Sequence, residues 1–164
     1  MADISAKNAE AYAARYGLRI IERLGFGIHG TVHVAEGKIK TENSAVKAHI
    51  SAAPYLRECA VYERLKEADI SEILGFHVPQ LIRTDDELRV IEMTIVTRPF
   101  VLDFAGAYLD SAPDFSHEVW ADWEQQKREQ FGERWRTVRA VVDAFEEMDI
   151  YLADVTPNNI AFKD

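Results

Sequence analysis

Three glycines form the first feature of this sequence with a type and spacing suited to chemistry. Gly25, Gly27 and Gly30 make a GxGxxG pattern, and residues 31–34 after it are rich in β-branched side chains. Glycines let a backbone approach a ligand closely. In a dinucleotide-binding fold the pattern opens a helix, whereas here it is followed by a strand-like stretch. The pattern therefore predicts a loop between two antiparallel strands that covers bound phosphates, with an ordinary hairpin turn as the alternative.

A lysine and a glutamate form the second feature. Lys47 lies between apolar neighbours on a strand predicted over residues 44–50, and a lysine that faces inward needs an anionic partner. Glu58 falls on the apolar face of a helix predicted over residues 54–68, where an unpaired carboxylate would be costly. We therefore expect Lys47 and Glu58 to pair. The alternatives are a lysine on an exposed strand face and a glutamate at the edge of a surface face.

A carboxylate and an amide close the series near the end of the chain. Asp154 and Asn159 lie in a polar loop between two short apolar stretches. Their oxygens could hold a hydroxyl nucleophile and a hard cation. Asp, Pro and Asn are also common turn residues, so a polar turn is equally consistent with this segment.

The elements that must position these residues follow from hydrophobic periodicity. The pattern predicts an α+β fold: a mostly antiparallel sheet with one inserted helix, a break at residues 97–99, and then a helical portion that ends in short strands. The predicted helices span residues 4–16, 54–68, 116–131 and 131–148, and the predicted strands span residues 18–24, 31–35, 44–50, 80–84 and 87–96.

Composition excludes several classes of protein. The 164 residues are 48% hydrophobic, which is too apolar for a disordered chain, and no apolar run approaches the roughly 20 residues that span a bilayer. The net charge of −9 disfavours nucleic acid as a partner. The negative charge lies outside the first 50 residues, whose own net charge is +2. The first ten residues do not resemble a signal peptide, and Cys59 is the single cysteine, so we expect a cytoplasmic protein without an internal disulfide.

Taken in this order, these three features resemble the protein kinase-like superfamily over about residues 18–164. The resemblance implies a protein kinase-like α+β fold with an antiparallel five-stranded small lobe and one inserted helix, then a hinge and a partial, mainly helical large lobe. The expected domains are residues 1–96 for the small lobe and residues 97–164 for the hinge, the helical part and the catalytic loop.

The resemblance also implies a role for each site residue, with ATP and Mg²⁺ as cofactors. The glycines Gly25, Gly27 and Gly30 would cover the phosphates, which Lys47, fixed by Glu58, would hold. Asp154 would be the catalytic aspartate that orients the acceptor hydroxyl, and Asn159 the metal ligand. The adenine would be bound by Val32, Ala45, Met93 in the gatekeeper position, and the backbone of Thr94 to Val96.

Three departures from the family pattern leave two functions open. The HRD triplet reads Leu152-Ala153-Asp154, and the loop lysine of many kinases is replaced by Thr156. By this resemblance, the DFG segment, which carries the second metal-binding aspartate, would follow Asp164. We expect Asp164 itself to be solvated and not to replace the DFG aspartate. The chain is therefore expected to be an ATP-binding phosphotransferase with impaired activity or, alternatively, a pseudokinase acting as a binding or regulatory module.

The resemblance leads to one expectation about protein partners. The helix predicted over residues 131–148 would pack under further helices in a complete large lobe, so Trp135 and the valines near it are expected to be partly exposed. A homodimer or a protein partner could cover them, and the polar helix that carries Trp120 and Trp123 could add to that contact surface.

Overall fold

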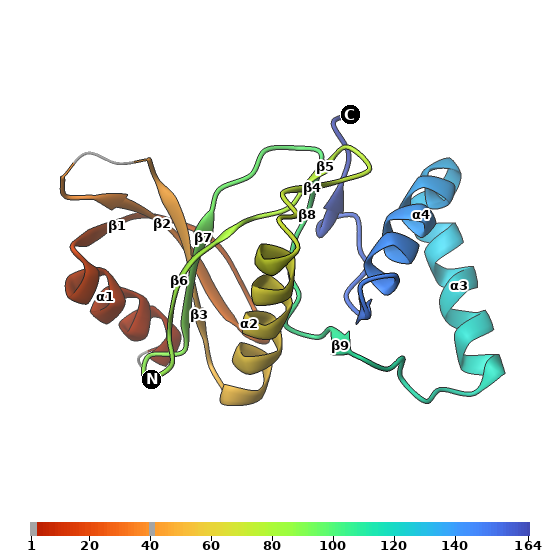
Figure 1. Cartoon of the computed structure of the whole chain (residues 1–164), viewed down its shortest axis with the longest axis horizontal. Helices are drawn as coiled ribbons and strands as arrows, with labels where there is room; N and C mark the ends of the chain where they lie inside the picture. The colour runs from red at the N-terminus through yellow and green to blue at the C-terminus, as the bar shows by residue number, and fades with distance from the viewer. Residues whose placement is uncertain (1–2, 40–41) are drawn as a thin grey trace.

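A five-stranded antiparallel sheet forms the N-terminal half of the molecule (Figure 1). The computed structural model describes residues 3–39 and 42–164. The sheet has the strand order β1-β2-β3-β7-β6, and it confirms the expected α+β class and five-stranded antiparallel sheet. Its strands are β1 (Leu18–Gly27), β2 (Gly30–Gly37), β3 (Ser44–His49), β6 (Leu81–Asp85) and β7 (Val90–Thr94).

Two helices cover opposite faces of this sheet. Helix α1 (Ile4–Tyr16) packs on one face, where Val46 and Ala48 of β3 join its apolar side in a small core. Helix α2 (Ala52–Glu67) covers the other face. Successive strand side chains point to opposite faces, so Lys47, which lies between Val46 and Ala48, points towards α2. Every residue of β3 is buried because both of its faces are covered.

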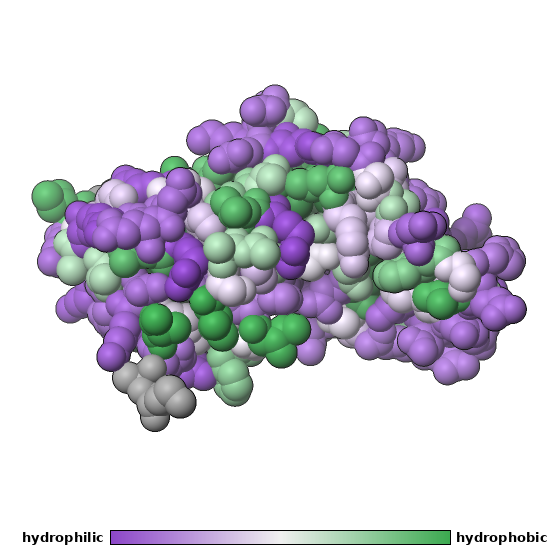
Figure 2. Space-filling view, turned by 90° about the horizontal axis from the view of Figure 1, so that it is seen from below, coloured by the Kyte–Doolittle hydropathy of each residue, from purple (hydrophilic) through white to green (hydrophobic). Residues whose placement is uncertain are grey.

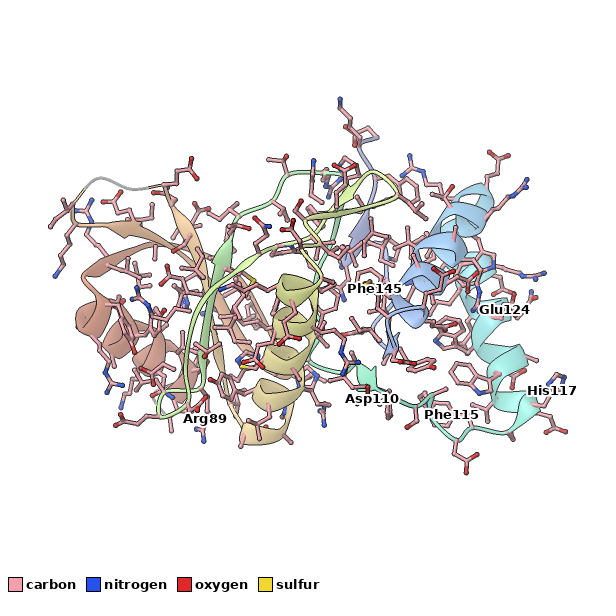
Figure 3. All side chains as sticks on the ribbon, viewed as in Figure 1. Arg89, Asp110, Phe115, His117, Glu124 and Phe145 are labelled. Carbon is pink, nitrogen blue, oxygen red and sulfur yellow. The ribbon has the colours of Figure 1, made fainter. Side chains whose placement is uncertain are left out.

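The helical half is a hairpin of two helices. Helix α3 (His117–Phe131) is capped at its N-terminus by Ser116, whose hydroxyl accepts a hydrogen bond from the Val119 amide. A 3-10 turn (Gly132–Arg134) then leads into α4 (Trp135–Glu146). In Figure 3 the side chain of Phe145 on α4 points inward, whereas Glu124 on α3 points away from the molecule.

The expectation that this helix face is partly exposed is wrong. Trp135 is 8% exposed, and Val138 and Val142 are 0% and 1% exposed. The reason is that α3 folds back onto α4, with the ring of Trp123 5.9 Å from that of Trp135. Trp123 is thereby half-buried and packs against the core.

Six short strands connect the two halves. Strands β9 (Tyr108–Leu109) and β10 (Ile150–Tyr151) form an antiparallel pair. A second sheet has the order β11-β8-β5-β4, with β8 antiparallel to β11 and parallel to β5. Its members are β4 (Glu72–Ile73), β5 (Phe76–His77), β8 (Phe100–Val101) and β11 (Ile160–Ala161). The two nearest the end of the chain, β10 and β11, are the short strands expected on either side of the polar loop, whereas the other four were not expected.

The boundaries of several expected elements shift in the structure. Strand β1 continues to Gly27, so the predicted glycine turn over residues 25–30 narrows to residues 28 and 29. The strand predicted over residues 87–96 is the shorter β7, because residues 86–89 form the turn from β6. The helix expected over residues 131–148 begins with the 3-10 turn and ends at Glu146.

The surface mixes polar and apolar residues. In the view of Figure 2, hydrophobic residues gather near the middle of the face, with hydrophilic residues around them. Within the described residues, no helix has both the length and the apolarity required to cross a membrane.

Candidate functional site: a cleft beneath the glycine hairpin

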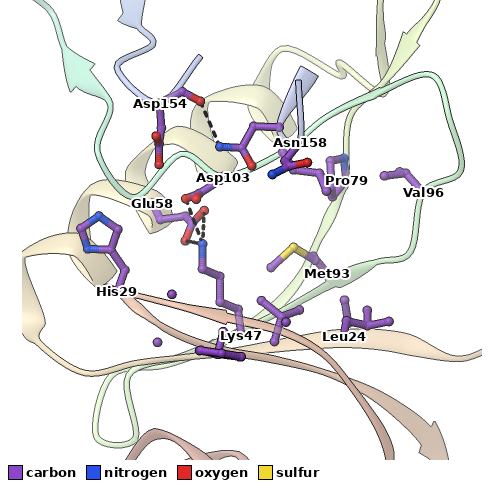
Figure 4. Close-up of a pocket in the computed structure, with 18 of the residues that line it drawn as sticks. Leu24, His29, Lys47, Glu58, Pro79, Met93, Val96, Asp103, Asp154 and Asn158 are labelled. Carbon is purple, nitrogen blue, oxygen red and sulfur yellow. Dashed lines mark hydrogen bonds and ion pairs between the residues drawn. The ribbon is translucent and has the colours of Figure 1, made fainter. Parts of the chain in front are cut away.

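A cleft of about 570 Å³ opens between the sheet and the loops of the C-terminal half (Figure 4). The structure brings all of the predicted site residues to it. They are Gly25, Gly27, Gly30, Val32, Ala45, Lys47, Glu58, Met93, Thr94, Val96, Asp154 and Asn159. Asp164 lies outside the cleft, with its side chain 94% exposed.

The glycine hairpin forms the roof of the cleft. Gly25 and Gly27 have open space where a side chain would stand, so the backbone there is accessible to a ligand. Gly30 is different, because its φ is +150° and an added Cβ would lie 1.9 Å from the carbonyl oxygen of Ala48 on β3. Gly25 and Gly27 are thus open towards the cleft, whereas Gly30 is required for β2 to lie close to β3.

A buried ion pair forms the floor. The Nζ of Lys47 lies 2.8 Å from Oε1 of Glu58, on the first part of α2. Glu58 is fully buried and has two more donors: His49 Nε2, which donates at 2.7 Å, and the backbone amide of Phe104, which donates at 2.8 Å. The carboxylate is therefore saturated with hydrogen bonds, which is the condition for burying an ion pair at acceptable cost.

The pKa values of the pair follow from this geometry. Burial alone would raise the pKa of Glu58, but Lys47 and His49 outweigh it and lower the pKa to about 2. Burial likewise disfavours the charged form of Lys47, but Glu58 and Asp103 raise its pKa above the ordinary value. Both groups are therefore charged at neutral pH.

Asp103 is a site residue that the sequence analysis missed. Its Oδ1 lies 3.2 Å from Lys47 Nζ, and it lines the cleft between Lys47 and Asp154. Its φ is +68°, a backbone conformation that is uncommon for a residue other than glycine. One signal was available: Asp103 stands alone within the apolar run of residues 100–105, and a carboxylate there needs a partner.

The polar loop brings the remaining two groups to the opposite wall. The side-chain amide of Asn159 donates to the backbone oxygen of Asp154 at 3.0 Å, which leaves the Asn159 side-chain oxygen to accept from a ligand or to bind a cation. Burial, reinforced by the nearby carboxylate of Asp103, raises the pKa of Asp154. Two carboxylates and an amide oxygen thus meet at one end of the cleft.

The other end of the cleft is apolar. Met93 is buried there and accepts a hydrogen bond from Tyr62, and Leu24 and Pro79 add further apolar surface. The Thr94 amide donates to the carbonyl oxygen of Gln80, so it is already occupied within the protein. Residues 94–96 were expected to hydrogen-bond a base; the other two, Ile95 and Val96, both line the cleft.

Among the described residues, a metal ion in the cleft would need ligands from the substrate as well as from the protein. Among residues 3–39 and 42–164, no three His, Cys, Asp or Glu side chains converge on a metal site. Mg²⁺ is commonly bound by one or two carboxylates together with substrate phosphates. The group of Asp103, Asp154 and Asn159 is consistent with that mode of binding.

Comparisons with known proteins identify no close relative. No family model and no curated protein match the chain. Among solved structures, a mutant PknI kinase domain from Mycobacterium tuberculosis is similar, with 17% sequence identity and a TM-score of 0.37. The match covers 80% of this chain and 48% of that domain, so the chain spans about half of its length. This distant likeness carries no argument for function, which must come from the geometry of the cleft.

The glycine geometry leads to a first prediction. Gly30→Ala should lower the free energy of unfolding by about 1–3 kcal/mol, because the new methyl group collides with backbone and the φ is unfavourable. Gly27→Ala is the matched control and should change stability far less, because its position is open. Urea unfolding of both variants measures the difference, and equal losses would contradict the structure.

The buried carboxylate leads to a second prediction. Glu58→Gln should cost about 3–5 kcal/mol of stability at pH 7, because it leaves Lys47 and His49 without their shared anion. The pKa of Glu58 is depressed on folding, so its contribution is present above the unfolded value of about 4.3 and is lost as pH falls towards 2. The difference between the two proteins should therefore shrink over that range.

Glu63→Gln provides the control for this measurement. Glu63 lies on the same helix but is exposed, so its substitution should change stability by less than about 0.5 kcal/mol at any pH. Equal effects of the two substitutions at pH 7 in urea titrations would show that Glu58 is not the buried partner of Lys47.

Proposed function

We propose that this chain is a protein kinase-like nucleotide-binding protein that transfers a phosphoryl group from ATP to a hydroxyl group. The observation that carries the proposal is the Lys47–Glu58 pair beneath the glycine hairpin, at the point where the apolar and polar ends of the cleft meet. A fixed ammonium group beneath accessible backbone suits a polyphosphate. The apolar end of the cleft suits an adenine ring.

Each part of the nucleotide has a counterpart in the cleft. Val32, Ala45 and Met93 offer apolar contacts to the base, and the backbone at Ile95 and Val96 offers hydrogen bonds to its edge. Lys47 would bind the α- and β-phosphates, with Glu58 holding the ammonium in position. Gly25 and Gly27 would let the hairpin backbone lie against the phosphates.

The transfer itself needs a base near the acceptor. Asp154 would accept the proton of the acceptor hydroxyl, while that oxygen forms a bond to the γ-phosphorus and the bond to the β,γ-bridging oxygen breaks, releasing ADP. Its raised pKa makes it a better proton acceptor than an ordinary carboxylate. Mg²⁺, when bound, would neutralise phosphate charge, and the side-chain oxygen of Asn159 would be one of its ligands.

A thermal-shift experiment tests nucleotide binding. ATP at 100 times its dissociation constant should stabilise the protein by about 2.7 kcal/mol. Lys47→Ala should abolish the shift measured against its own unfolding temperature. Lys66→Ala, an exposed lysine on α2, should retain the shift. The absence of any shift at millimolar ATP would overturn the proposal.

The same preparation tests catalysis. ATP turnover with Mg²⁺ should be lost in Asp154→Asn while the ATP-dependent thermal shift persists, because Asp154 acts on the acceptor rather than on the nucleotide. A wild-type protein that binds ATP without any turnover would be the pseudokinase alternative, in which the cleft serves binding or regulation.

A further inference from the structure

The structure assigns a second metal-binding carboxylate to the cleft: we propose that Asp103, in the segment that precedes the helical hairpin, binds the nucleotide-associated Mg²⁺ opposite Asn159. The inference rests on the proposed nucleotide site and extends it. The resemblance to protein kinases implies that such a ligand follows the catalytic loop in sequence. In the structure, a carboxylate from an earlier segment, Asp103 in residues 100–109, lies at the cleft.

Strand pairing is what brings Asp103 to the polar loop. Strand β8 runs antiparallel to β11, with Val101 opposite Ile160, and the Leu102 amide donates to the Asn159 carbonyl oxygen at 2.8 Å. Asp103 comes just after β8 and Asn159 just before β11, so the pairing of these two strands brings the two proposed ligands to the same end of the sheet. The following strand β9 then pairs with β10, just before Asp154. The segment is thus held against the catalytic loop on both sides of Asp103.

Packing of the next residue fixes Asp103 further. Phe104 is completely buried, with its ring 5.3 Å from that of Tyr62 on α2 and 5.6 Å from that of Phe145 on α4. Its backbone amide donates to Glu58. Because Phe104 is anchored in the core, the backbone of Asp103 is held beside the cleft.

The Asp103 side chain is accessible from the cleft and could bind a cation in addition to Lys47. It is 28% exposed, on the cleft side of the Lys47 ammonium group. One oxygen contacts Lys47, and Asp154 and Asn159 lie across the same end of the cleft. A cation between these oxygens would lie where Lys47 and the glycine hairpin direct the phosphates. Carboxylate and amide oxygens are hard ligands of the kind that Mg²⁺ prefers.

Asp103→Asn is the variant of choice. It removes one negative charge, keeps the shape, and asparagine tolerates the left-handed backbone conformation at this position. Asp110→Asn is the matched control, because Asp110 is also at positive φ, has a 71% exposed side chain, and lies outside the residues that line the cleft.

Binding of Mn²⁺, measured by the electron paramagnetic resonance signal of the free ion in the presence of a non-hydrolysable ATP analogue, tests the proposal without any need for turnover. The wild-type protein with the analogue should bind Mn²⁺ more tightly than the analogue alone. Asp103→Asn should weaken this binding by at least about tenfold, the loss seen even for outer partners of metal sites. Asp110→Asn should bind as the wild type does.

The possible failures are distinguishable. If Asp103→Asn binds the analogue and Mn²⁺ as tightly as the wild type, Asp103 is not a ligand, and the proposal is overturned while the nucleotide site stands. If the wild type does not bind the analogue at all, the proposed function fails and this inference fails with it.

A measurement on the wild type keeps the proposal open to test if Asp103→Asn does not fold. Fe²⁺ replaces Mg²⁺ in the nucleotide complex, and ascorbate with peroxide then generates radicals that cut the backbone beside the metal. Cuts near both Asp103 and Asn159 support the proposal. Cuts confined to residues 154–159 would overturn it.

Discussion

The charge of Lys47 is the constraint around which this structure is organised. The side chain is only 10% exposed, so its ammonium group requires anions, and it has two: Glu58 from α2 and Asp103 from the segment after β8. Glu58 in turn receives hydrogen bonds from His49 and from the backbone of Phe104. One cation thus connects the sheet, the inserted helix and the segment that leads into the helical half. Breaking such a network leaves an uncompensated buried charge, which is why it tolerates little change.

The same network explains the order of the segments around the cleft. Residues 100–109 come before the helical hairpin in sequence, yet they pair with strands on both sides of the polar loop that follows it. Asp103 is therefore adjacent to Asp154 and Asn159 although about 50 residues separate them in sequence. Under our proposal, this strand pairing brings a metal-binding carboxylate to the cleft from a segment that precedes the helical hairpin, whereas Asp154 and Asn159 follow the hairpin. Phe104 makes the arrangement rigid by filling the core between α2 and α4.

Local sequence patterns were sufficient to predict the sheet, the four helices and the glycine hairpin, because each depends on spacing along the chain. The places of Val32, Ala45, Met93 and residues 94–96 in the cleft were expected only from the family resemblance. The partner of Lys47 could be inferred because Glu58 is a charge on an apolar helix face. The lone charge of Asp103 in an apolar run was a similar signal, but it did not show where Asp103 lies. Two-residue strands have no periodicity, and their pairing depends on tertiary contacts. The burial of Trp135 was mispredicted for a related reason: nothing in the sequence of α4 shows that α3 folds back onto it.

The most direct test of this account is the position of the metal in the nucleotide complex. Crystals grown with Mn²⁺ and a non-hydrolysable ATP analogue would locate the ion by its anomalous scattering. If Asp103 and Asn159 share the ion, the peak lies between the phosphates and the side-chain oxygens of these two residues, at about 2.0–2.3 Å from each oxygen, close to the distances at which Mg²⁺ binds. A nucleotide bound above Lys47 with its metal ion away from Asp103 would contradict this account.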